Sequence, residues 1–245
     1  KFLLSTEIVI HTITQVYYIT KNIKCQKITV LFSRFLPSDM IKYASKEDKA
    51  RIRACFESIP KQLSKENKKF QYSTIRTGAR AKDYWGCLQW IEDAGIVRKC
   101  YNLQRPELPL AGNAIDNVFK VDMADTGLFV SMLEDGTQAD ILQGDLLGYK
   151  GAIFENLLAD FLGKMQRPLY YYHKEGGLEI DFVMRYKGEC TLLECKATTG
   201  HAKSLRTILS NPDKYHIYQA IKVGSYNIGR SDGILTIPHY LAFCL

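Results

Sequence analysis

The sequence predicts an α/β protein in which a mostly helical N-terminal unit is followed by an α/β domain with a mixed central sheet. The chain of 245 residues is long enough to bury two modest cores, and its character changes between Gly136 and Gly148. Before that change, apolar residues recur at helical spacing from residue 38 onward. After it, one amphipathic helix is followed by short strand-like runs that carry charged residues.

The composition argues against a membrane protein and favours a cytoplasmic one. No apolar run approaches the ~20 residues that are needed to span a bilayer. The cysteines form no CxxC pair and no zinc-like grouping with histidine, which predicts reduced thiols in the cytoplasm. The chain begins at Lys1 without a secretory signal, so we expect a fragment of a longer protein.

The net charge of +7 is concentrated in one region. Residues 41–105 contain 15 Lys or Arg against 7 Asp or Glu, while the rest of the chain is nearly balanced. A concentrated positive field attracts phosphate backbones, so DNA is the expected partner. The alternative is a solvated, lysine-rich helical surface without such a partner. The nucleic-acid contacts are assigned to the following residues: Arg76, Arg80, Lys82, Arg98 and Lys99.

The first part of the chain predicts helices after an unassigned start. Residues 1–37 contain β-branched stretches but no chemical signature, so their role stays open. Ser38 and Asp39 are good N-cap residues, and the apolar spacing after them predicts two helices before Pro60.

A third helix and two strands complete the first predicted domain, residues 38–135. The helix is expected over residues 79–94 and ends at Gly95, because a left-handed cap favours glycine. Strands are expected over residues 96–101 and 117–122. This order is typical of a winged helix, whose third helix can enter a DNA groove. The alternative is a unit that contacts only proteins, with these third-helix residues in its core: Tyr84, Trp85 and Leu88.

The second predicted domain, residues 145–245, begins with an amphipathic helix over residues 150–162. Glu155 falls at the edge of its apolar stripe, where a carboxylate can lean toward the sheet that the helix covers. Asn156 and Asp160 are expected on the opposite, solvated face.

Three strand-like runs follow this helix. The first spans residues 169–173, and the second, residues 178–184, carries Asp181 between apolar neighbours. The third carries Glu194 and Lys196, which are two residues apart and therefore lie on one face. The last two runs predict a hairpin with charged groups inside.

Buried charges of this kind favour a shared cation. Burying two carboxylates and an ammonium is costly unless they have a common partner. Asp181 and Glu194, with Glu155 and the main-chain carbonyl of Cys195, would offer hard oxygen ligands to Mg²⁺ or Mn²⁺. The metal would activate water against a phosphodiester, and Lys196 would orient that water or stabilise the transition state. The predicted catalytic residues are Asp181, Glu194, Lys196 and Glu155.

These residues resemble the PD-(D/E)xK nuclease superfamily, with Glu155 on a helix, Asp181 on a strand and Glu194-Cys195-Lys196 on the next strand. Segments 122–128, 177–183 and 193–197 are also similar to the C-terminal half of a family of bacterial and archaeal AAA-type ATPases. In that family an ATPase domain precedes a winged helix and a nuclease-like domain of unknown function.

Three functional hypotheses follow. The first is a magnesium-dependent, endonuclease-like module that processes DNA beside its winged helix. The second is a catalytically inactive DNA-binding or regulatory module, because a Glu-x-Lys pair is also common as an exposed charge pair. The third makes this chain the C-terminal part of an ATPase whose ATPase domain is missing here. No GxxxxGK[ST] phosphate loop is present, so neither ATP binding nor ATPase activity is expected.

Overall fold

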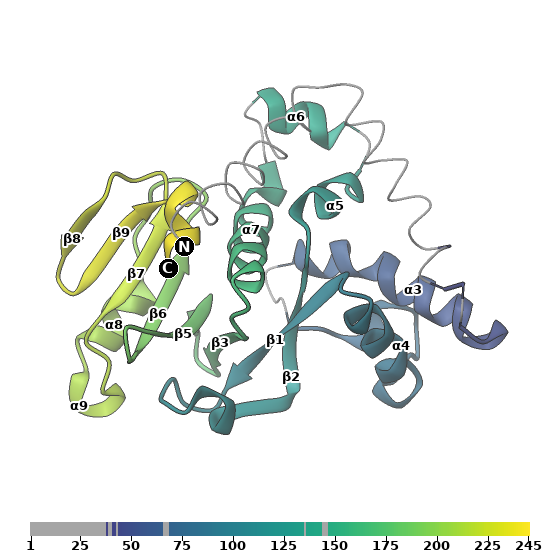
Figure 1. Ribbon diagram of the computed structural model, residues 1–245, viewed down its shortest axis with the longest axis horizontal. Coiled ribbons are helices and arrows are strands. Elements are labelled where there is room, and N and C mark those ends of the chain that lie inside the picture. The colour runs from purple at the N-terminus through teal and green to yellow at the C-terminus, as the bar shows by residue number, and fades with distance from the viewer. Residues whose placement is uncertain (1–37, 39–40, 43, 66–68, 135, 144–146) are drawn as a thin grey trace. The chain divides into compact units, whose positions relative to one another are not determined.

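The computed structural model describes residues 38–245 except 39–40, 43, 66–68, 135 and 144–146 (Figure 1). The segment 1–37, whose role the sequence left open, lies outside the described residues. The chain forms two compact units. The first contains the described residues up to Lys99 together with Val121–Ile153, and the second contains Cys100–Lys120 and Phe154–Leu245. The second unit therefore includes a strand pair from the segment predicted to be a winged helix.

The first unit contains helices α3, Lys46–Leu63, and α4, Ala81–Asp93, which pack against each other (Figure 1). α3 is one continuous helix where two were expected. Its cap is Ser45, whose side chain accepts a hydrogen bond of 3.1 Å from the N–H of Asp48. Pro60 lies in the last turn and does not end the helix.

The predicted end of the third helix is confirmed. Gly95 follows α4 with a φ of +72°, in the left-handed region. Its N–H donates to the carbonyl of Glu92 at 2.8 Å, and the N–H of Ile96 donates to the carbonyl of Ile91 at 3.2 Å. These two bonds form a Schellman motif and satisfy carbonyls at the end of the helix.

The core of the first unit differs from the prediction at one aromatic residue. Tyr84, Leu88 and Ile91 are buried on one face of α4, as the apolar spacing indicated. Trp85 is 56% exposed, so it does not belong to the core, because its position lies outside that face. Two further helices follow in this unit, α5 at Thr126–Ser131 and α6 at Thr137–Gln143.

The first sheet has the strand order β2-β1-β3-β4. The predicted strands are present: β1 spans Val97–Leu103 and β2 spans Ala114–Met123. β1 pairs in parallel with β3, Leu169–Lys174, which pairs antiparallel with β4, Leu178–Ile180.

The second sheet has the strand order β5-β6-β7-β9-β8. β5 and β6 form the predicted hairpin, and β7 and β9 extend the sheet in parallel with β6. The strands are β5 Phe182–Tyr186, β6 Glu189–Cys195, β7 Ala220–Gly224, β8 Gly229–Ser231 and β9 Ile234–Pro238. Short 3-10 segments lie at Tyr72–Thr74, Leu110–Asn113, Leu147–Tyr149 and His239–Cys244.

The chain changes sheets at Asp181. The sequence predicted one strand over residues 178–184, whereas the structure has β4 before Asp181 and β5 after it. β4 pairs with β3 in the first sheet, and β5 pairs with β6 in the second. Asp181 therefore stands at a break between strands.

Helices cover both faces of the second sheet. α7, Lys150–Lys164, packs Leu158 and Phe161 against Phe182 on one face. On the other face α8, Lys203–Leu209, packs with Val183, and α9, Pro212–Tyr215, follows it. This is a three-layer arrangement around a mixed sheet, as the predicted α/β class requires.

One prediction about α7 was wrong. Asn156 and Asp160 were expected on a solvated face, but their exposed fractions are 0% and 1%. Asp160 pairs with Lys164 at 2.9 Å, which compensates its charge. The helix is enclosed on more sides than its apolar stripe indicated.

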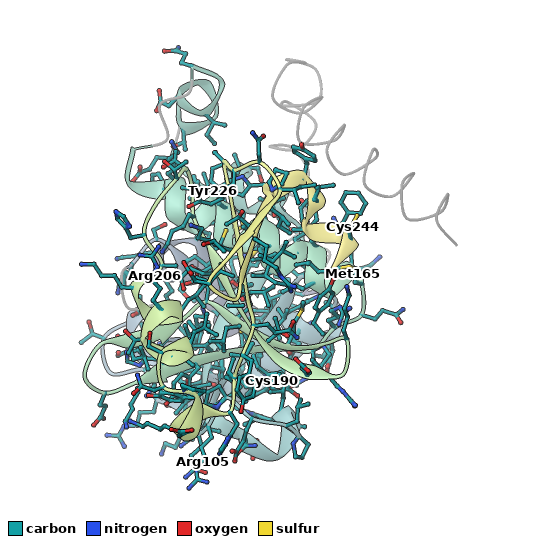
Figure 2. The ribbon with its side chains drawn as sticks, turned by 90° about the vertical axis from the view of Figure 1, so that its left-hand side faces the viewer. Arg105, Met165, Cys190, Arg206, Tyr226 and Cys244 are labelled. Atoms are coloured by element: carbon teal, nitrogen blue, oxygen red, sulfur yellow. The ribbon has the colours of Figure 1, made fainter. Side chains whose placement is uncertain are left out.

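The described cysteines are free thiols. Burial raises the pKa of Cys55 and of Cys190 to about 12, whereas Cys244 is exposed (Figure 2). Among the described residues, no helix combines the length and the apolar character that crossing a membrane requires.

The glycine cap of α4 makes a stability prediction. Gly95→Ala should destabilise the protein by about 1–2 kcal/mol, because an L-residue is strained at this positive φ. Gly86→Ala, within α4 and with open space around an added Cβ, should stabilise it by about 1 kcal/mol. Urea unfolding monitored by circular dichroism measures both, and equal effects of the two substitutions would contradict the cap.

Candidate functional site

Asp181 is held through both its side chain and its main chain. Its carboxylate oxygen Oδ2 accepts a hydrogen bond of 2.8 Å from the N–H of Cys195, at the end of β6. Its main-chain carbonyl accepts a hydrogen bond of 3.2 Å from the ammonium of Lys120. Since Phe182 pairs with Leu193, the register sets Asp181 beside Glu194.

Glu194 is a buried carboxylate with one paired oxygen. Oε1 lies 2.5 Å from the Nζ of Lys196, whereas Oε2 is buried without a hydrogen-bond partner among the described residues. Burial raises the pKa of Glu194, and the nearby carboxylates of Glu155 and Glu179 raise it further, against the lowering effect of Lys196. A buried, unpaired carboxylate oxygen is unfavourable unless a cation or a donor reaches it.

Lys196 keeps its charge in this setting. Burial lowers its pKa, but the bond to Glu194 and the charges of Asp181 and Cys195 more than offset this, so the pKa is raised. Its side chain is 30% exposed, so solvent reaches part of it. Lys196 can therefore present a positive charge beside two carboxylates.

His239 holds the main chain of Lys196. Its Nε2 lies 2.8 Å from the carbonyl oxygen of Lys196, and its ring stacks on Phe154 with centroids 4.2 Å apart. Burial lowers the pKa of His239, while the bond to the carbonyl raises it, with a net lowering. Because a carbonyl only accepts, Nε2 carries the proton of this imidazole.

Glu155 forms a buried ion pair with a residue that the sequence did not assign. Its Oε1 lies 2.7 Å from the Nζ of Lys120, on β2. The exposed fractions of the two residues are 5% and 1%. The ammonium also lies 4.7 Å from the ring centroid of Tyr171 and 5.2 Å from that of Phe182. Lys120 thus neutralises the carboxylate that was expected to help bind a metal.

The predicted chemical residues converge in the second unit. Asp181 acts on the pKa of Lys196, and Glu155 acts on the pKa of Glu194, so the four groups share one electrostatic environment. The thiol of Cys195 donates to the carbonyl of Phe154 at 3.3 Å. The cluster contains more carboxylates than ammonium groups.

No preformed metal-binding group of three or more His, Cys, Asp or Glu side chains occurs in the part of the chain that the structure describes. The reason is visible in the contacts, since each carboxylate has an oxygen engaged by Lys120, Lys196 or the N–H of Cys195. The donor set still fits Mg²⁺ or Mn²⁺, because Oε2 of Glu194 is a hard oxygen left without a partner.

The basic residues assigned to nucleic acid divide into two groups. Arg76, Arg80 and Lys82 are exposed, before and at the start of α4. Arg98 donates to the carbonyl of Ala124 at 3.3 Å. Lys99 is buried, with its ammonium 2.7 Å from Glu92 and 2.7 Å from Gln89. An internal ion pair of this kind does not present its charge to a phosphate, so Lys99 is set apart from the exposed group.

A family model described as Domain of unknown function (DUF8612) matches residues 15–139, just over half of the chain. The chain belongs to this family. A second model, Domain of unknown function (DUF4143), matches residues 150–240, and this domain type is known from the C-terminus of AAA-like ATPases. No curated protein and no solved structure matches the chain.

The two matched regions contribute different parts of the site. The DUF4143 match contains Glu155, Asp181, Glu194 and Lys196, whereas Lys120 lies in the DUF8612 match. One signal for Lys120 was present in the sequence, because a lysine between the apolar residues Phe119 and Val121 is unusual in a buried strand. His239 had no comparable signal, because it binds through the main chain of Lys196.

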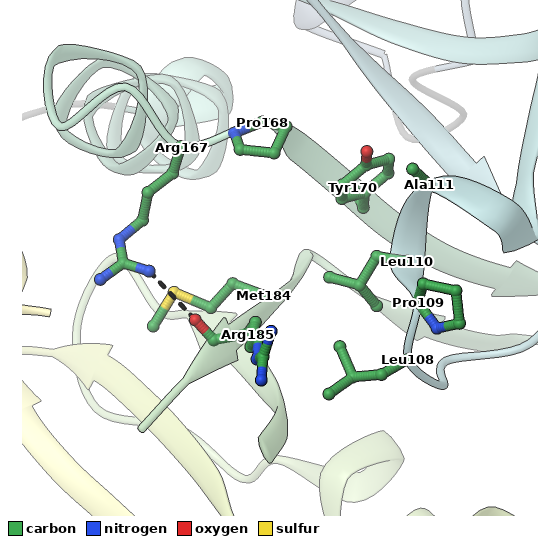
Figure 3. A pocket seen from close by; sticks show the side chains of 9 residues that line it. All are labelled: Leu108, Pro109, Leu110, Ala111, Arg167, Pro168, Tyr170, Met184 and Arg185. Atoms are coloured by element: carbon green, nitrogen blue, oxygen red, sulfur yellow. Dashed lines mark hydrogen bonds between the residues drawn. The ribbon is translucent and has the colours of Figure 1, made fainter. Parts of the chain in front are cut away.

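A cavity of about 540 Å³ in the second unit is separate from this site (Figure 3). It is lined by apolar side chains of residues 108–111, by Tyr170 and Met184, and by two arginines. Arg167 donates to the carbonyl of Arg185 at 3.0 Å, as the dashed line shows (Figure 3). None of the predicted catalytic residues lines the cavity, so the candidate chemistry lies at the end of the β5–β6 hairpin.

The raised pKa of Glu194 predicts a dependence of stability on pH. The folded state holds the proton of this carboxyl more tightly than the unfolded state, whose pKa is about 4.3. Its contribution to stability is therefore lost as the pH rises from that value through the folded pKa. Glu194→Gln removes this loss, so the stability of the variant relative to the parent should increase with pH. Urea unfolding between pH 4 and pH 8 tests this, and a relative stability that falls with pH would contradict it.

Proposed function

We propose that this chain is a metal-dependent phosphodiester hydrolase module that acts on DNA, joined to a winged helix. The observation that carries the proposal is the buried Oε2 of Glu194, which has no partner among the described residues and stands beside Asp181 and Lys196. A cation would satisfy this oxygen and offset the surplus of carboxylates.

Asp181 and Glu194 would hold a Mg²⁺ or Mn²⁺ ion, with the main-chain carbonyl of Cys195 as a further predicted ligand. When bound, such an ion lowers the pKa of water and neutralises charge that develops on a phosphodiester. The hydrogen bond from Cys195 fixes the carboxylate of Asp181, so that its orientation does not depend on the metal. His239 fixes the main chain of Lys196 in the same way.

Lys196 would act on the reacting phosphate. Its partial exposure allows the ammonium to leave Glu194 for a phosphate oxygen, where it stabilises the negative charge of the transition state. The oxygen of Glu194 that it releases would then be available to a cation. Glu155 would support the site through its charge, since its oxygen Oε1 is bound to Lys120.

DNA would be bound by the exposed residues Arg76, Arg80 and Lys82, beside the helix that a winged helix inserts into a groove. The DUF4143 match supports the further proposal that the module acts beside an AAA-type ATPase domain that these residues do not contain. A cytoplasmic location fits the free thiols and is part of the same proposal.

A second candidate function is a catalytically inactive DNA-binding or regulatory module. Lys120 and Lys196 already compensate two of the carboxylates, and such pairs can hold a fold together without a metal. The two candidates differ in whether the charged residues are needed for cleavage.

Cleavage assays separate these candidates. Linear, nicked and single-stranded DNA should be cleaved with Mg²⁺ or Mn²⁺, and Asp181→Asn and Lys196→Met should each lower the rate by about 100-fold or more. The matched control is Glu189→Gln, an exposed carboxylate on the same strand β6, which should retain the parent rate. Cleavage that survives unchanged in both site variants would remove this site from the proposal.

DNA binding can be tested without cleavage. Replacing Arg76, Arg80 and Lys82 by alanine should weaken binding and lower the slope of log K against log salt by about 0.9 for each lost phosphate contact on duplex DNA. The control replaces Arg53 and Lys61, exposed residues of α3, and should leave most of the slope. Fluorescence anisotropy at several salt concentrations measures both, and an identical slope in the two variants would exclude the assigned surface.

A further inference from the structure

We propose that the ammonium of Lys120 takes the place of a second cation, so that the site binds one divalent ion and not two. This inference rests on the proposed function and specifies its metal stoichiometry. It follows from the surroundings of Lys120 in the second unit. The Nζ is bound by a carboxylate oxygen of Glu155 at 2.7 Å and by the main-chain carbonyl of Asp181 at 3.2 Å.

The atoms around this ammonium are of the type that bind a hard cation. Carboxylate and carbonyl oxygens are the ligands that Mg²⁺ and Ca²⁺ take from proteins. The rings of Tyr171 and Phe182 add their electron-rich faces at 4.7 and 5.2 Å from the Nζ. The position is therefore a cation site, occupied by a cation that belongs to the chain.

Lys120 cannot readily be displaced by an ion from solution. It is 1% exposed and Glu155 is 5% exposed, so solvent barely reaches their contact. The tether of the side chain keeps the ammonium beside its ligands at a high effective concentration. Removing it would leave Glu155 buried and uncompensated, which is strongly unfavourable.

The other lysine of the site differs in this respect. The side chain of Lys196 is 30% exposed, and its partner Glu194 has a second oxygen without a partner among the described residues. An incoming ion therefore meets an accessible pair at Glu194 and Lys196, and a closed pair at Glu155 and Lys120. We expect the ion to bind to Asp181 and Glu194, with Glu155 outside its ligand set.

Counting bound Mn²⁺ tests the proposal, by electron paramagnetic resonance of the free ion during titration of the whole chain. The parent should bind one ion, and Lys120→Met should bind two, because Glu155 and the carbonyl of Asp181 become available. Lys120→Arg keeps the positive charge and should bind one. The double variant Lys120→Met/Glu155→Gln removes both charges of the pair and should also bind one.

The outcomes distinguish this inference from the function on which it rests. Two ions in the parent, or one ion in a folded Lys120→Met variant, would overturn the role of Lys120 and leave the nuclease proposal intact. No bound ion in the parent would overturn both. If Lys120→Met does not fold, the parent, Lys120→Arg and the double variant still decide, since a count other than one in any of them contradicts the proposal.

Discussion

Two buried ion pairs, Lys120 with Glu155 and Lys196 with Glu194, constrain the end of the sheet on which the candidate site stands. Each pair joins charges that could not be buried singly, because removing one partner of such a pair typically costs several kcal/mol. Lys120 also binds the main-chain carbonyl of Asp181, so the same ammonium fixes α7 and the break between β4 and β5. Stability and site geometry therefore depend on the same few contacts.

The sequence predicted the parts of this arrangement that have a local signal. Gly95 marked the end of α4, and the two-residue spacing of Glu194 and Lys196 placed both on one face of β6. The partners of Lys120 are 35 and 61 residues away along the chain, and strand periodicity carries no information about such distances. The lysine could be noticed among its apolar neighbours, but its role required the tertiary structure.

The wrong predictions have a common physical origin. Asn156 and Asp160 were assigned to solvent because they lie off the apolar stripe of α7, yet their neighbours enclose that side of the helix as well. Lys99 was assigned to DNA because it belongs to the basic region, yet it pairs with Glu92. Periodicity and charge count describe one element at a time, whereas burial depends on every element packed against it.

The boundary between the two matched families passes through the site. Glu155 lies in the region matched by DUF4143, and its counter-ion Lys120 lies in the region matched by DUF8612, although both belong to one compact unit. The second region alone would contain every predicted catalytic residue and still leave a buried carboxylate without its ammonium. The strand that supplies Lys120 is therefore part of the site physically, and the two matched regions depend on each other for its charge balance.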